Sequence, residues 1–153
     1  MAHRVVREIC ASVPELSEHV AILEAITDRL DTKHFDLACR YDSSVSMTVW
    51  LKGRGIVYLA LKNGAGGRTV VFDLLHELGH IESGEPTVHH RVDDLDYKRE
   101  QVQRENAAWA LAEKALIEFG LAQHRNEFLA HRDQCLATYG IERTPPTPAP
   151  EPY

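Results

Sequence analysis

The sequence predicts an α+β fold, in which a small three-stranded antiparallel sheet packs against a histidine-bearing helix and further helices. Two observations favour this class. Residues 34–61 hold three short runs of β-branched and aromatic residues separated by turn signals. The flanking segments place apolar residues at steps of three and four, the period of an amphipathic helix. With 153 residues, 44% of them hydrophobic, the chain suffices for one domain, residues 1–140, followed by a proline-rich tail at 141–153.

Helices are expected before the sheet, at residues 3–11 and 15–31. The second follows Pro14, which is tolerated in a first helical turn. Its apolar positions recur at helical spacing, at Leu16, Val20, Leu23, Ile26 and Leu30.

The three predicted strands read FDLACR (35–40), SMTVWL (46–51) and GIVYLAL (55–61). Asp42-Ser43-Ser44 separates the first two, and Lys52-Gly53-Arg54-Gly55 separates the second and third as a tight hairpin. Such short connections favour antiparallel pairing. The glycine-rich NGAGG then ends the sheet.

Three helices are expected after the sheet, at residues 69–83, 97–119 and 122–139, ended by Gly84, Gly120 and Gly140. Residues 84–96 are polar and contain a proline, so they predict a loop. The first of these helices has an apolar face, with His76, His80 and Asp73 on its other side. That apolar face is formed by Val71, Leu74, Leu75, Leu78 and Ile81.

Residues 76–80 read HELGH, the H-E-x-x-H pattern of zinc peptidases, in which two histidines lie on one side of a helix. Shuffling this composition would produce the pattern in about one chain in twenty. The alternative is a pair of surface histidines on an amphipathic helix. Gly79 leaves room beside the histidines for a metal, a strand or a substrate, or serves tight helix packing; both interpretations stay open.

A zinc site needs a third protein ligand, and Glu105 is the candidate. It is the one charged member of an apolar stripe on the helix at 97–119, where an ionised carboxylate is costly unless it is paired or metal-bound. The alternative is that Glu105 lies at the edge of the stripe and reaches solvent or an arginine. The other members of the stripe are Val102, Trp109, Ala112, Leu116 and Phe119.

The stretches VYLALKNGAGGRTVVFDLLHELGH and ENAAWALAEKAL resemble the ImmA/IrrE-type metallopeptidase family, over roughly residues 45–120. Glu105, Ala108, Leu111, Ala112 and Leu116 match its second motif, E-x-x-A-N-x-F-A-x-x-L-L. The resemblance implies a minimal zincin-like domain that holds one Zn²⁺ through His76, His80 and Glu105. It also implies a regulatory endopeptidase of phage or mobile elements, whose protein partner is a helix-turn-helix repressor.

Trp109 departs from this family, which usually has Asn or Asp at that position. An indole donates a hydrogen bond but cannot accept one from a histidine ligand. Asp73, one turn before His76, or a backbone carbonyl would then have to orient the ligand. The departure favours a second hypothesis, a catalytically weak or inactive metal-binding module that binds and sequesters a protein partner.

In the peptidase hypothesis, Glu77 is the general base beside the metal-activated water. The tetrahedral intermediate needs a hydrogen-bond donor for its oxyanion, and the candidates are His131, His124, Tyr97 and Tyr139. His131 is preferred, because it shares a stripe of its helix that could face the core. The alternative for each histidine is a packed or surface side chain. His89 and His90 are interpreted as loop residues.

The composition argues against other classes of protein. A net charge of −6 disfavours a nucleic-acid binder, and the basic Lys98, Arg99 and Arg104 are interpreted as a solvated helix face. No apolar run approaches the roughly 20 residues that span a bilayer. The N-terminus, MAHRVVREIC, lacks the apolar core of a signal peptide, which predicts a cytoplasmic protein.

Three cysteines, Cys10, Cys39 and Cys135, are odd in number and far apart, and they form neither a CxxC motif nor a disulfide framework, so they are expected as small core residues. The tail TPPTPAPEPY is either a disordered end or an extended ligand for an aromatic groove. The sequence leaves the oligomeric state open.

Overall fold

The computed structural model describes residues 3–61, 67–86 and 95–138. It confirms an α+β fold. In chain order the elements, with η marking 3₁₀ helices, are α1 (Arg4–Ser12), η1 (Pro14–His19), α2 (Val20–Thr32), β1 (Phe35–Arg40), β2 (Met47–Val49), β3 (Gly55–Ala60), α3 (Gly67–Glu82), α4 (Leu95–Glu118), η2 (Ala122–His124) and α5 (Arg125–Thr138).

The sheet is mixed, so the prediction of an antiparallel sheet was wrong for one of its two pairings. The strand order is β1-β3-β2; β2 pairs antiparallel with β3, whereas β1 runs parallel to β3. The reason lies in β3, whose nearly continuous apolar run is typical of a strand enclosed on both faces. β3 therefore takes the centre, and the chain between Arg40 and Met47 passes it to reach the opposite edge.

Two predicted elements differ in extent. The helix expected at 15–31 is divided into η1 and α2, because His19 has φ −113° and ψ 20°, outside the helical region. Its inward face survives the break, since Leu16, Leu23 and Leu30 are all fully buried. The strand expected at 46–51 is reduced to the three residues of β2.

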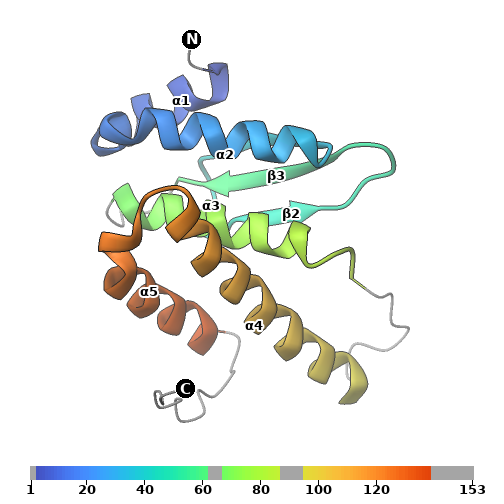
Figure 1. Cartoon of the computed structure of the whole chain (residues 1–153). Helices are drawn as coiled ribbons and strands as arrows, with labels where there is room; N and C mark the ends of the chain where they lie inside the picture. Colours follow the sequence, from blue (N-terminus) through green and yellow to red (C-terminus); the bar gives the residue numbers. More distant parts are fainter. Residues whose placement is uncertain (1–2, 62–66, 87–94, 139–153) are drawn as a thin grey trace.

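The sheet lies between two groups of helices. Figure 1 shows α1 and α2 on one side of the strands and α3, α4 and α5 on the other. One hydrophobic cluster runs through both groups, from Val6 and Ile9 on α1, through Val57 and Leu59 on β3, to Phe128 on α5. Helix α3 lies at its centre and is buried on nearly every side, including the side that carries the histidines.

Helices α3 and α4 approach each other closely at Gly79. A Cβ atom at this position would lie 2.2 Å from the carbonyl oxygen of Ala108. Of the two interpretations of Gly79, tight helix packing is therefore the one seen. The contact brings the histidine side of α3 against the Glu105 side of α4.

The predicted helix ends are close to the observed ones. Gly84 and Gly120 follow α3 and α4 with φ of +99° and +83°, a left-handed conformation that glycine adopts at little cost. Helix α4 begins at Leu95, inside the predicted loop, and η2 replaces the expected first turn of the last helix. Gly140 and the tail at 141–153 lie outside the described residues. Within the described ranges, no helix has the length and apolarity needed to cross a membrane.

Candidate metal centre

His76, His80 and Glu105 meet in the interface between α3 and α4. The two histidines are one turn apart on α3, and their ring centroids lie 4.5 Å from each other. His76 Nε2 is 3.1 Å from Glu105 Oε1, and His80 Nε2 is 3.1 Å from Glu105 Oε2. The three residues form a group that could hold a metal ion.

The distances between these nitrogen and oxygen atoms are close to those between the ligands of a zinc ion. Tetrahedral zinc with bonds of about 2.0–2.1 Å to nitrogen and oxygen places neighbouring ligand atoms about 3.3 Å apart. The observed His–Glu separations of 3.1 Å are within a few tenths of an ångström of that value. Two imidazoles and one carboxylate are also the ligand set of many catalytic zinc sites, which keep a fourth position open.

Glu105 is buried, with 6% of its surface exposed, and its ion-pair partners within the described chain are the two histidines. Neither alternative from the sequence, solvent or an arginine, is seen in this region. Burial acts to raise the pKa of Glu105, but the hydrogen bonds from His76 and His80 outweigh it and lower the pKa to about 2. The carboxylate is therefore held ionised, as a metal ligand must be.

Glu77 is held beside the histidines by the sheet. Its side chain is only 6% exposed, and its Oε1 atom accepts a hydrogen bond of 2.7 Å from the Thr48 hydroxyl on β2. Its Oε2 atom lies 3.6 Å from His76 Nδ1. Burial raises the pKa of Glu77, while the neighbouring His76 and the Thr48 hydrogen bond oppose the rise. A carboxyl group whose pKa is raised in this way is a stronger base than an exposed glutamate, as a general base requires.

Trp109 fixes the orientation of His76 by stacking. The two rings are nearly parallel, at 9°, with centroids 4.1 Å apart. Trp109 thus supports His76 through its ring face, a role for which no hydrogen-bond acceptor is needed. Its Nε1–H group is buried and has no partner among the described residues.

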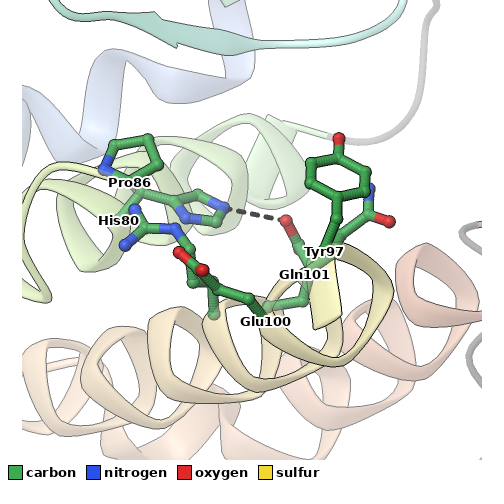
Figure 2. A pocket seen from close by; sticks show the side chains of 7 residues that line it. His80, Pro86, Tyr97, Glu100 and Gln101 are labelled. Carbon is green, nitrogen blue, oxygen red and sulfur yellow. Dashed lines mark ion pairs between the residues drawn. The ribbon is translucent and has the colours of Figure 1, made fainter. Parts of the chain in front are cut away.

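A small pocket opens at this candidate metal-binding group. It measures about 130 Å³ and is lined by His80 and Glu105 together with Pro86, Tyr97, Glu100, Gln101 and Arg104. Figure 2 shows Pro86 and His80 on one side of this pocket and Tyr97 and Gln101 on the other; the dashed line is the His80–Glu105 ion pair. The pocket is smaller than the roughly 300 Å³ at which small-molecule sites begin.

Of the other residues predicted for the site, some lie near His76, His80 and Glu105 and others do not. Tyr97 lines the pocket, while His124 lies 4.0 Å from Glu127 on α5. The selected donor, His131, is 2.6 Å from Asp73, the residue expected to orient a histidine ligand. His131 also lies edge-on to the Trp109 ring, with 6.1 Å between the ring centroids. His89, His90 and Tyr139 lie outside the described residues.

Sequence reasoning missed two contributors. Thr48 belongs to a predicted strand, but nothing in its neighbourhood signals that its hydroxyl reaches Glu77, 29 residues away. The position of Trp109 in the apolar stripe, one helical turn after Glu105, is a usable signal that its ring stacks on a neighbouring histidine, and it did not enter the sequence prediction. Both contacts depend on how β2 and α4 pack on α3.

Comparison with known proteins finds no match to a family model, a curated protein or a solved structure. The geometry of the site and the motif resemblance are therefore the two indications of what the protein does.

Proposed function

We propose that this chain is a zinc-dependent endopeptidase with a minimal zincin-like domain, which hydrolyses a peptide bond in a specific protein partner. The observation that carries the proposal is the convergence of His76, His80 and Glu105, with Glu77 directly beside them. Their burial between a sheet and a second helix argues against an adventitious pair of surface histidines.

His76, His80 and Glu105 would hold the metal. When bound, Zn²⁺ supplies Lewis acidity, which polarises the scissile carbonyl and lowers the pKa of the attacking water. Glu77 takes the proton from that water and later delivers it to the leaving amine. The Thr48 hydroxyl holds the Oε1 atom of Glu77, which limits its rotation during both transfers. In this scheme Tyr97, which lines the pocket, replaces His131 as the donor to the oxyanion.

Strand β2 supports a peptide as the substrate. It forms one edge of the sheet, and an extended chain can pair with the free side of such a strand. Met47, Val45 and Leu51, on β2 and its flanks, are large apolar side chains exposed by 42% or more. A substrate on this edge would pass Thr48 and so approach Glu77.

The partner class comes from the motif resemblance: a separate helix-turn-helix repressor, cleaved in the cytoplasm. The protein encoded next to this gene is the first substrate to test. Incubated with zinc-loaded enzyme, it should give two discrete fragments. Glu77→Gln should retain the metal and reduce cleavage at least about a hundredfold, because it removes the general base. Glu15→Gln, an exposed change on η1, is the matched control and should cleave normally.

A second candidate function is a metal-stabilised module that binds and sequesters the partner. The observation that favours it is Trp109, a bulky ring where the resembled family has a small polar residue. Sequestration predicts that the partner elutes intact with the chain from a sizing column. It further predicts that wild type and Glu77→Gln form the same complex with the intact partner. If the chain is a peptidase instead, the intact partner should persist with Glu77→Gln and be cleaved by wild type.

A further inference from the structure

We propose that Asp73, His131 and Cys135 form a second divalent-metal site, which fastens α5 to α3. The three side chains are half-buried and group separately from His76, His80 and Glu105. His131 and Cys135 are one turn apart on α5, and Asp73 faces them from α3. The site goes beyond the proposed peptidase function and does not require it.

The donor atoms already surround one point. His131 Nε2 is 2.6 Å from Asp73 Oδ1 and 3.6 Å from Cys135 Sγ, and all three atoms lie within 4.8 Å of one another. Zinc bonds of about 2.3 Å to sulfur and about 2.0–2.1 Å to nitrogen and oxygen place tetrahedral N and S atoms about 3.6 Å apart, and N and O atoms about 3.3 Å apart. The sulfur is thus at ligand distance, and the carboxylate oxygen needs to withdraw by less than about 1 Å.

The same geometry excludes a cysteine protease-like triad. In such a triad the thiol faces one ring nitrogen and the carboxylate holds the other. Here Cys135 and Asp73 both face Nε2 of His131. An N–H group on Nε2 of His131 can point at only one of these two acceptors, whereas a metal ion between the three side chains would bind all three donor atoms.

The surroundings form a partly apolar enclosure. His131 lies against the ring of Phe72, at 6.0 Å between centroids, and against Trp109, at 6.1 Å. Apolar walls limit access of solvent to a metal and strengthen its binding to charged ligands. Trp109 therefore contacts a histidine of each centre.

The donor set selects the kind of metal. Thiolate and imidazole ligands favour Zn²⁺ and disfavour Mg²⁺ and Ca²⁺, which take oxygen ligands. Because α5 contributes two of the three ligands and α3 the third, occupancy would hold the C-terminal half of α5 in place.

Metal stoichiometry tests the site on the full chain. Wild type loaded with Zn²⁺ and desalted should carry two equivalents, and Cys135→Ala should carry one. Cys10→Ala is the matched control, since Cys10 is also a half-buried thiol but bonds the Leu16 carbonyl instead. His76→Ala should also carry one equivalent, namely the one that depends on Cys135.

Cobalt gives a readout specific to the thiolate. Co²⁺-loaded wild type and His76→Ala should show sulfur-to-cobalt charge-transfer absorption in the near ultraviolet, and Cys135→Ala should lose it. Asp73→Asn, a change of similar shape, should weaken the second equivalent at least about tenfold while circular dichroism stays unchanged. Equal metal content in wild type and Cys135→Ala, or cobalt binding without thiolate absorption, overturns the site. A wild type that carries only the Cys135-dependent equivalent, with its metal content unchanged in His76→Ala, would count against the proposed peptidase and leave this site standing.

Discussion

Trp109 is the residue whose role changed most between sequence and structure. As a departure from a family motif it signalled a missing acceptor, yet it packs flat against His76 and fills the space between α3, α4 and α5. Glu105 shows the opposite case. A lone carboxylate in an apolar stripe predicted a buried ligand, and the structure places it between the two histidines, because burying an ionised group requires partners of this kind.

Replacing the Trp109 ring should separate its packing role from its ligand-orienting role. Trp109→Ala should lower the free energy of unfolding by about 3–5 kcal/mol and weaken zinc binding, because His76 loses its stacking surface. Trp109→Phe keeps an aromatic face and should retain most of the zinc affinity. Denaturant unfolding and zinc competition titrations measure the two effects. Equal zinc affinity in wild type and Trp109→Ala would show that stacking does not orient His76.

Thr48 should control the acidic limb of the pH–rate profile. Its hydrogen bond favours the ionised form of Glu77, so Thr48→Val should raise the pKa of Glu77 further above its ordinary value. Catalysis needs the ionised base; the limb should therefore shift to higher pH, with activity reduced in acid and recovered in alkali. Thr32→Val, whose hydroxyl bonds the Arg29 carbonyl, is the control. Superimposable kcat/KM profiles for wild type and Thr48→Val would contradict this role.

At the scale of elements, the sequence located the five α-helices of the described residues but not the two 3₁₀ helices, because the step between buried residues is a local property of the chain that a break such as that at His19 does not interrupt. The direction of β1 was not predictable in the same way. Side chains alternate between the two faces of a strand in parallel and antiparallel pairs alike. The connection at residues 41–46 is long enough either to pair β2 with β1 directly or to carry the chain past β3 to the opposite edge of the sheet. The near-continuous apolar run of β3 was the signal for its central position. The sequence left two interpretations of Gly79 open, and the packing of α3 against Ala108 on α4 distinguishes them.

Gly79→Ala should disturb the site through helix spacing rather than chemistry. The added methyl would meet the Ala108 carbonyl at 2.2 Å, so α3 and α4 must separate. We expect a loss of about 1–3 kcal/mol in stability despite the better helix propensity of alanine, together with weaker zinc binding as Glu105 moves away. Ala107→Val adds bulk on the exposed side of α4 and should change stability by less than about 0.5 kcal/mol. A stabilised Gly79→Ala that binds zinc normally would refute the spacing argument.

For the whole molecule, metal binding should appear as thermal stability. A ligand at a thousand times its Kd stabilises the native state by about 4 kcal/mol, which for a chain of this size raises Tm by about 8–16 °C. Scans in excess Zn²⁺ and in chelator should differ by at least that amount for wild type, since each occupied centre adds its own contribution. The double variant His76→Ala/Cys135→Ala should melt at the same temperature in both. A chelator-insensitive wild type would remove the basis for either centre.

The central position of α3 also has a consequence for how the molecule opens. Eleven of its sixteen residues are buried, whereas α5 buries only Phe128 and Leu136. Amide protons of α3 should therefore exchange with solvent deuterium only through global unfolding, while those of α5 exchange through local opening. His76 and His80 would then stay assembled with Glu105 after α5 has detached. The two centres would thus report on different events: one on the last structure to unfold, the other on the first.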